Sequence, residues 1–205
     1  NRVIIATDDK RIFKTAESFN AGVIMTSKEH PSGTDRCNEV LEKLEGNFDF
    51  VINIQGDEPF IFPEQISQLC AILDKETEFA TLAKKITDSK KLNDPNSVKV
   101  IFDNNHNAIY FSRHPIPFNR DFEIKDWLNH GDYFKHIGIY AYKSELLKRV
   151  CQIPRSSLEI SESLEQLRWI QHGYKIKIGI TELESPNIDS PSDVENLEID
   201  KFLKD

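Results

Sequence analysis

Three short apolar runs, each followed by a helix-like segment, occupy the first 76 residues of the chain and limit its fold more than any other feature. The runs cover residues 2–6, 22–27 and 48–55, and in each following segment the apolar side chains recur every three to four residues. Parallel neighbouring strands need crossover connections, which are usually helices. The alternation therefore predicts an α/β fold with a mostly parallel central sheet and helices on both faces.

The middle of the chain has a different pattern. Residues 97–103 and 107–113 are strand-like, and the turn-rich residues between them predict a β-hairpin. The irregular, aromatic segment 115–133 is typical of a long connection that forms a wall over a site. Further strands are expected at 80–86, 134–142 and 175–181, and further helices at 144–151, at 163–173 and from Ser190 and Pro191 onward. We expect a single domain over 1–205.

Charge and composition exclude several classes of function. The net charge of −8 argues against a nucleic-acid partner, because phosphate backbones are held by clustered Lys and Arg. No apolar run approaches the roughly 20 residues that span a bilayer, and no signal peptide opens the chain, so we expect no membrane partner and a cytoplasmic location. Cys37, Cys70 and Cys151 are too few and too far apart for a disulfide scaffold or a CxxC metal site.

The apolar run 48–55 stops at Gly56 and is followed at once by Asp57, Glu58 and Pro59. A charge at the end of a buried strand costs free energy unless something pairs with it. These residues fit a turn, with Gly for the bend, Asp as a cap and Pro as the exit. Ligands of open α/β sheets bind outside the carboxyl ends of strands, so Asp57 also fits a magnesium ligand beside substrate phosphates. No Walker loop or GxGxxG is present.

Two further segments combine a structural and a functional interpretation. Residues 32–36, Ser-Gly-Thr-Asp-Arg, start a predicted helix, where backbone N–H groups can meet a nucleotide, but their spacing also fits a helix cap. Arg113 closes a predicted strand before two stiffening prolines. Its fork suits a carboxylate or phosphate, although a surface salt bridge explains it equally well.

Polar residues of the second half offer weaker candidates. His136 lies in a strand-like run, where a histidine is more often a structural hydrogen-bonding group than a substrate contact. Glu165 and Gln166 belong to a predicted helix, and most such pairs face solvent, although they could bind sugar hydroxyls. Asp189 precedes Ser190 and Pro191 in a helix-start pattern that needs no ligand.

Together the motifs resemble one family over nearly the whole chain, the 3-deoxy-manno-octulosonate cytidylyltransferases, also called CMP-Kdo synthetases. The matching segments are VINIQGDEP at 51–59, ATD at 6–8, HPSGTDR at 30–36, NDPNSVKVI at 93–101, IYFSRHPIP at 109–117, FKHIGIYAY at 134–142, LEQLR at 164–168 and NIDSPSDVE at 187–195. The resemblance implies a Rossmann-like nucleotidyltransferase with a β-hairpin and dimerisation insertion. It further implies a homodimer, using the region 134–142, that couples CTP and Kdo to CMP-Kdo plus pyrophosphate for lipopolysaccharide biosynthesis.

The resemblance also assigns roles to individual residues. It implies that Asp57 and Asp189 hold Mg²⁺ and carry the catalysis. The remaining residues that it implies contact the substrates are Ser32, Gly33 and Arg36 on the cytidine side and, around the sugar acid or nucleotide, Gln55, Arg113, His136, Tyr140, Glu165 and Gln166.

The chain departs from the family in two places. Ile160 stands where a histidine is expected after the Leu-Glu pair. The family's basic N-terminal strand and triphosphate-binding loop, on the order of 40 residues with their helix, are absent, so we expect the domain to be incomplete at its N-terminus. Two different functions are also compatible with the sequence: another CMP-sugar synthetase of the sialic-acid type, and a non-catalytic sugar-nucleotide binding protein.

Overall fold

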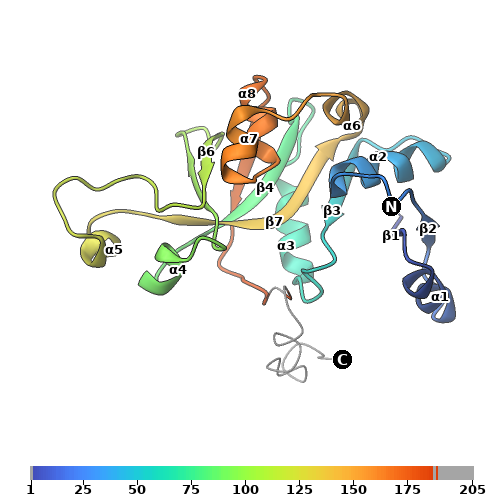
Figure 1. Cartoon of the computed structure of the whole chain (residues 1–205), viewed down its shortest axis with the longest axis horizontal. Coiled ribbons are helices and arrows are strands. Elements are labelled where there is room, and N and C mark those ends of the chain that lie inside the picture. The colour runs from blue at the N-terminus through green and yellow to red at the C-terminus, as the bar shows by residue number, and fades with distance from the viewer. Residues whose placement is uncertain (1, 187, 189–205) are drawn as a thin grey trace. The chain divides into compact units, whose positions relative to one another are not determined.

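Residues 2–186 and 188 are described by a computed structural model of the chain, and they divide into two units (Figure 1). The first unit comprises Asn1–Asn53 and Tyr142–Ile153, and the second comprises Ile54–Ala141 and Pro154–Asp205. The chain therefore passes between the units more than once, and strand β7 (Phe134–Lys143) begins in the second unit and ends in the first. The prediction of a single domain stays a prediction.

The first unit begins with the strand–helix alternation that the sequence predicts. Strands β1 (Ile5–Thr7) and β2 (Val23–Met25) pair in parallel. The helices of this unit are α1 (Lys10–Ser18), α2 (Gly33–Lys43) and α6 (Ser144–Cys151), of which α2 and α6 are in contact. Asp9 caps α1, because its carboxylate accepts a hydrogen bond of 2.7 Å from the Arg11 N–H.

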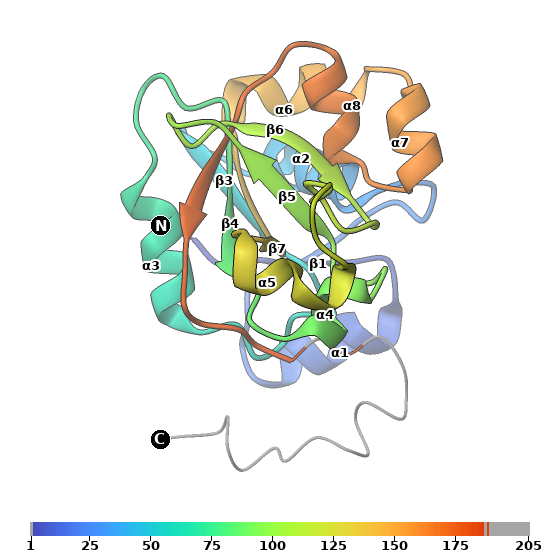
Figure 2. The same ribbon diagram turned by 90° about the vertical axis from the view of Figure 1, so that its left-hand side faces the viewer.

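The large sheet lies mainly in the second unit and has the strand order β6-β5-β7-β4-β8 (Figure 2). Its strands are β4 (Phe79–Lys85), β5 (Lys99–Phe102), β6 (Ala108–Ser112), β8 (Ile176–Ile180) and β7. Strand β3 (Phe50–Ile54) also pairs with β7, whose last residues belong to the first unit. β4 and β8 are parallel, whereas β5 runs antiparallel to both β6 and β7, so the sheet is mixed.

The core of the second unit forms around β4. The first five residues of this strand, from Phe79 to Ala83, are buried, as expected for a strand covered on both faces. The Phe79 ring stacks on Trp169 of α8 (Gln166–Gln171) with ring centroids 4.9 Å apart. Helix α3 (Pro63–Ala71) also contacts β4, and its Leu69 is fully buried. These contacts hold the sheet and its helices together.

The aromatic segment 115–133 contains two short helical turns, η1 (Ile124–Asp126) and α5 (Trp127–His130). The Trp127 indole N–H donates to the Phe122 carbonyl at 2.9 Å. Trp127 and Tyr133 pack in a buried cluster with Ile86 and Leu92. The segment is therefore held by a small apolar core of its own, next to helix α4 (Ser89–Asn93).

The structure confirms the α/β class, the central sheet and the hairpin, whose strands β5 and β6 pair antiparallel. Three α-helices were not predicted, α4, α5 and α7 (Ser157–Glu162), which have five, four and six residues. Elements this short contain too few turns for an apolar period to be visible. The helix predicted at Ser190 lies outside the described residues. No helix in the described part of the chain is long and apolar enough to cross a bilayer.

Candidate active site

Asp57 lies in the turn that follows β3, as the sequence predicts. The turn is closed by the Glu58 N–H, which donates to the Gln55 carbonyl at 3.1 Å. The Oδ1 atom of Asp57 is buried and has no hydrogen-bond partner among the described residues. A buried carboxylate oxygen without a partner costs free energy, because it has lost its water. The turn interpretation alone leaves this atom unexplained, whereas a bound cation would satisfy it.

The chain returns to Asp57 from far along the sequence. The Ile188 N–H donates to the Asp57 carbonyl at 2.9 Å. Asp189, the predicted second magnesium ligand, is the next residue in the sequence but lies outside the described residues. Among the residues that the structure describes, no group of three or more His, Cys, Asp or Glu side chains could hold a metal ion. Asp57 is therefore the anchor from which a metal site would have to be built.

Glu58 is not a solvent-facing turn residue, because only 6% of it is exposed. Its Oε2 accepts a hydrogen bond of 3.0 Å from the Ser185 hydroxyl. A Cβ added at Gly138 of β7 would lie 3.3 Å from Glu58 Oε1, so a side chain there would crowd this carboxylate. Gln55, in contrast, is exposed. No sequence pattern marked Ser185 as a support of this turn.

In the first unit, Ser32 caps α2. Its hydroxyl accepts from the Asp35 N–H at 3.3 Å and donates to Asp35 Oδ2 at 2.6 Å. The capping interpretation of this segment is thus confirmed, and the nucleotide interpretation stays a prediction. A Cβ added at Gly33 would lie 3.2 Å from Asn53 Nδ2, so the backbone of α2 approaches β3 closely here.

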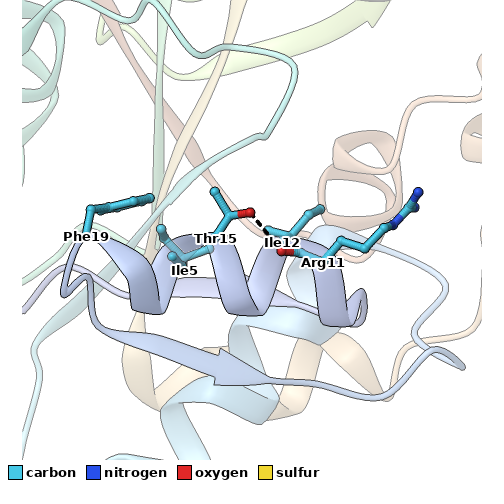
Figure 3. Close-up of a pocket in the computed structure, with 6 residues that line it drawn as sticks. Ile5, Arg11, Ile12, Thr15 and Phe19 are labelled. Atoms are coloured by element: carbon cyan, nitrogen blue, oxygen red, sulfur yellow. Dashed lines mark hydrogen bonds between the residues drawn. The ribbon is translucent and has the colours of Figure 1, made fainter.

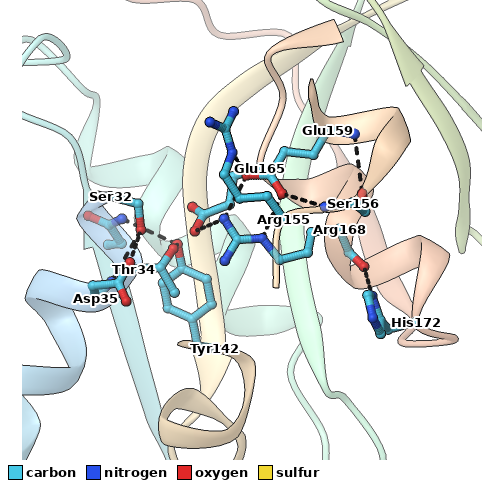
Figure 4. A network of polar contacts seen from close by, with 11 residues as sticks. Ser32, Thr34, Asp35, Tyr142, Arg155, Ser156, Glu159, Glu165, Arg168 and His172 are labelled. Atoms are coloured by element: carbon cyan, nitrogen blue, oxygen red, sulfur yellow. Dashed lines mark hydrogen bonds and ion pairs between the residues drawn. The ribbon is translucent and has the colours of Figure 1, made fainter. Parts of the chain in front are cut away.

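Buried polar contacts of Thr34 and Tyr142 accompany this approach (Figure 4). The Asn53 side-chain amide donates to the Tyr142 hydroxyl at 3.2 Å, and this hydroxyl lies 3.3 Å from Thr34 Oγ1. Each of these three residues is less than a tenth exposed. The first turn of α2 is therefore held against β3 and the end of β7, by three residues to which the sequence analysis assigned no individual role.

Arg36 faces the carboxyl ends of β1 and β2. Its guanidinium hydrogen-bonds the Thr26 hydroxyl and pairs with Asp8 at 3.5 Å. Asp8 and Thr26 belong to a hollow that is also lined by Asp9, Lys10, Met25 and Lys28. This position suits a ligand site, because ligands of α/β folds bind at the carboxyl ends of parallel strands.

A second hollow lies along α1 and is mostly apolar (Figure 3). Its lining residues are Ile5, Arg11, Ile12, Thr15, Ala16 and Phe19. Phe19 is 61% exposed and Ile12 is 52% exposed. None of the predicted site residues lines this hollow, so it is not a candidate for the chemistry.

The Arg113 guanidinium is already bound to the protein. It donates to the backbone carbonyls of Pro95, Glu162 and Ser163 at 3.1, 2.7 and 3.4 Å. The Glu162 carboxylate in turn accepts from the Arg113 N–H at 2.9 Å and from the Ser112 hydroxyl at 2.7 Å. Arg113 therefore fastens the end of α7 to β6 in this structure, and a substrate role stays a prediction.

His136 and Tyr140 lie together on β7. Their ring centroids are 5.1 Å apart, and Tyr140 also meets Trp169 of α8 edge to face at 5.5 Å. His136 Nε2 lies 3.0 Å from the Thr81 hydroxyl. Glu165 pairs with Arg168 at 3.7 Å, and Gln166 is only 5% exposed. The structure thus brings His136 and Tyr140 together near α8, the helix that contains Gln166.

The protonation of His136 should control stability in weak acid. Burial, with Lys135 nearby, lowers the pKa of His136 to about 3. The unfolded chain binds this proton near pH 6.5, so the stability due to neutral His136 is present above pH 6.5 and is lost as the pH falls toward 3. We expect the free energy of unfolding to fall by up to about 1.4 kcal/mol per pH unit.

The check is urea unfolding of a His136→Asn variant between pH 7 and 5. The variant should show a shallower pH dependence than the unaltered chain, whatever its absolute stability. His106→Asn is the control, because His106 is exposed. Equal slopes for the two variants would contradict the prediction.

Comparison with known proteins places the chain among nucleotide-transferring enzymes. A family model described as Cytidylyltransferase matches residues 1–177. A Bacteroides thetaiotaomicron protein named 3-deoxy-manno-octulosonate cytidylyltransferase is 50% identical over 204 residues, which are 98% of this chain and 81% of the relative. A Shewanella pealeana protein named 8-amino-3,8-dideoxy-manno-octulosonate cytidylyltransferase is 46% identical over 198 residues, 94% of this chain and 78% of the relative.

A solved structure agrees with these relatives. It is CMP:2-keto-3-deoxy-manno-octonic acid synthetase complexed with CTP, and it matches with a TM-score of 0.87 and 38% identity. The match covers 96% of this chain and 78% of the solved chain.

Proposed function

This chain belongs to the 3-deoxy-manno-octulosonate cytidylyltransferase family, and we propose that it couples CTP to Kdo, yielding CMP-Kdo and pyrophosphate for lipopolysaccharide biosynthesis. Members of the family are nucleotidyltransferases. One observation of the structure carries the proposal: an aspartate at the end of a strand, Asp57, has a buried carboxylate oxygen that no described group satisfies. A carboxylate oxygen at this position is the ligand that a metal ion bound to substrate phosphates would need.

Mg²⁺ is the proposed metal, held by Asp57 and Asp189. The donor set fits, because Mg²⁺ prefers oxygen ligands and takes one or two carboxylates plus substrate phosphates. Two observations support the pair: the unsatisfied Oδ1 of Asp57, and the hydrogen bond that brings residue 188 alongside Asp57. When bound, the metal supplies neutralising charge for the triphosphate.

The protein itself contributes position. In the proposed reaction the anomeric hydroxyl of Kdo attacks the α-phosphorus of CTP and gives up its proton to solvent. The new oxygen–phosphorus bond forms, and pyrophosphate leaves with the electron pair of the broken bond. Ser32, Gly33 and Arg36 are the proposed contacts on the cytidine side, at the start of α2. Holding both reactants in line accounts for much of the rate in such transfers.

The sugar side of the proposed site depends on residues of β7 and its neighbours. Its proposed members are Gln55, Arg113, His136, Tyr140, Glu165 and Gln166. Because burial lowers the pKa of His136 to about 3, this ring is neutral at pH 7 and would bind a hydroxyl rather than pair with the sugar carboxylate. The contact with the sugar carboxylate is therefore assigned to Arg113. To make it, the guanidinium would have to give up a hydrogen bond to a backbone carbonyl and donate to the substrate instead.

A second sugar should be tested beside Kdo. The Shewanella relative is named for 8-amino-3,8-dideoxy-manno-octulosonate, which differs from Kdo at carbon 8, and it is nearly as similar to this chain. A sialic-acid-type sugar would use the same chemistry in a different sugar pocket, whereas a non-catalytic protein would bind the nucleotide without turnover. The four functions are transfer to Kdo, transfer to its 8-amino analogue, transfer to a sialic acid, and binding without turnover. They are distinguished by the sugar, if any, whose addition leads to release of pyrophosphate from CTP.

Pyrophosphate release from CTP should require both Kdo and Mg²⁺. We expect excess EDTA to lower the initial rate at least about 100-fold, because metal-ion charge stabilisation contributes several kcal/mol to such transfers. The measurement is a coupled pyrophosphate assay with Kdo, its 8-amino analogue and a sialic acid in parallel. Release with another sugar alone would reassign the substrate, and no release with any sugar would reject the enzymatic proposal.

A homodimer and a cytoplasmic location complete the proposal. The cytoplasm is where CTP is available. β7, the strand that family resemblance associates with the dimer, is largely buried in the described part of the chain. Large apolar side chains are exposed nearby in the sequence, with Phe118 73% and Phe122 43% exposed. We place the proposed dimer contact on the segment 115–133 beside the start of β7.

A further inference from the structure

The described residues after β8, 181–186 and 188, which we call the strap, are attached to the second unit at several points. At its start the Thr181 N–H donates to the Ala83 carbonyl of β4 at 2.9 Å. The Gln65 side chain of α3 then donates to the Leu183 carbonyl at 3.4 Å. Single hydrogen bonds of this kind set the path of the strap but give it no strong anchor.

The strong anchor is Glu184. Its carboxylate meets three ammonium groups: Lys91 of α4 at 2.7 Å, Lys135 of β7 at 2.8 Å and Lys84 of β4 at 3.4 Å. The Glu184 side chain is only 15% exposed. Burial raises the pKa of Glu184, but the hydrogen bonds from Lys135 and Lys91 outweigh it and lower the pKa to about 2. Partly buried charges that converge on one carboxylate resist screening better than exposed pairs do.

Beyond Glu184 the strap reaches the turn that contains the candidate metal ligand. The buried Ser185 hydroxyl donates to Glu58 Oε2 at 3.0 Å. The Ile188 N–H donates to the Asp57 carbonyl at 2.9 Å. Two successive residues of one turn are thus held by a segment whose strongest attachment lies at Glu184.

We propose that Glu184 is a positioning residue for the metal site at Asp57: clamped by Lys84, Lys91 and Lys135, it holds the strap so that Ser185 and Ile188 fix the Asp57 turn. The inference rests on the proposed function, because it assigns the clamp a role in metal binding. Glu184 touches neither metal nor substrate in this role. Loss of the Glu184 carboxylate releases the strap from the three lysines, which weakens the support that Ser185 and Ile188 give to the turn.

The test compares Glu184→Gln with Glu182→Gln. Glu182 lies in the same strap and is exposed, so its replacement removes the same charge without touching the clamp. The first readout is hydrogen exchange of the strap peptide in the protein without metal. The second is the Mn²⁺ affinity, followed by electron paramagnetic resonance with CTP present. The third is the Mg²⁺ concentration that gives half-maximal pyrophosphate release.

In Glu184→Gln we expect exchange in the strap at least about tenfold faster and a Mn²⁺ affinity and half-saturating Mg²⁺ concentration weakened roughly tenfold, with the rate largely restored at saturating metal. Glu182→Gln should match the unaltered protein in all three. If Glu184→Gln fails to fold, Lys91→Gln, which leaves the Lys135 pair, should give the same changes to a smaller extent. Strap exchange or metal affinity like that of Glu182→Gln would overturn the inference. An unaltered protein that binds Mn²⁺ but releases no pyrophosphate would instead reject the proposed function.

Discussion

Replacing Asp57 with Asn should lower the rate of pyrophosphate release at least about 1,000-fold, an effect of about 4 kcal/mol on the barrier. The amide keeps the shape of the side chain but removes the negative charge that a hard cation requires. The fold should survive, because Oδ1 makes no hydrogen bond to any described residue that the substitution would break. The rate is measured at saturating CTP and Kdo over a range of Mg²⁺ concentrations, and the fold by circular dichroism.

Asp49→Asn is the matched control for this substitution. Asp49 is exposed and lies just before β3, and its backbone carbonyl accepts from the Ser144 N–H at 3.0 Å, a bond that the substitution leaves in place. Its replacement should leave turnover within about twofold of the unaltered protein, as expected for a surface change. Without metal, Asp57→Asn should unfold at a temperature no lower than the unaltered protein, because burying an unsatisfied oxygen costs a neutral amide less than it costs a carboxylate. Unchanged turnover in Asp57→Asn would refute the metal role.

Replacing Arg168 with Met should destabilise the protein by about 3–5 kcal/mol, the usual cost of breaking a buried ion pair from one side. Arg168 donates to both carboxylate oxygens of Glu159, at 2.7 and 2.6 Å (Figure 4). Their side chains are only 7% and 5% exposed. Met fills a similar space but leaves the Glu159 carboxylate buried without its main partner. Urea unfolding followed by tryptophan fluorescence measures the change.

Arg155 provides the contrast, because it pairs with the same carboxylate at 3.3 Å from a side chain that is 62% exposed. Arg155→Gln should cost less than about 1 kcal/mol, as exposed ion pairs do. A double variant, Glu159→Leu with Arg168→Met, should recover part of the loss, since it removes both charges. Equal destabilisation by Arg155→Gln and Arg168→Met would show that burial does not set the strength of this pair.

The same pair has a defined pH dependence. Burial raises the pKa of Glu159, but the hydrogen bonds from Arg168 and Ser156 outweigh it and leave the pKa below its usual value of 4.5. The stability from this group is therefore present above about pH 4.5 and is lost as the pH falls below it. The His136 contribution also changes in this range, since its window extends toward pH 3, so the Glu159 contribution is measured in the His136→Asn variant.

The sequence predicts the elements of the fold better than their pairing. The apolar runs predict β1, β2 and β3 with the helices that follow them. Each of these elements can be recognised from the spacing of the apolar residues within its own segment. The mixed sheet depends on β5, which runs antiparallel to both its neighbours, and such pairings are decided by contacts between distant residues. Helix α7 was missed because its capping box, Ser156 with Glu159, supports only six residues.

The candidate site shows the same division. Asp57 could be identified from the strand that precedes it, since the end of an apolar run is a local feature, although β3 is only half-buried and its last residue, Ile54, is exposed. The partner of Arg113 could not, because Glu162 lies 49 residues away and meets it only in the folded chain. The low pKa of His136 likewise arises from burial in the folded chain, which no residue beside it in the sequence indicates.

The pairing of β4 with β8 has a consequence for how the protein is made. Phe79 of β4 lies opposite Ile176 of β8, so one edge of this buried strand stays open until β8 has left the ribosome. Distant pairings of this kind slow folding, and an open apolar strand edge favours aggregation. Since the strap follows β8, Glu58 in the turn around Asp57 is synthesised 127 residues before Ser185, the strap residue that supports it.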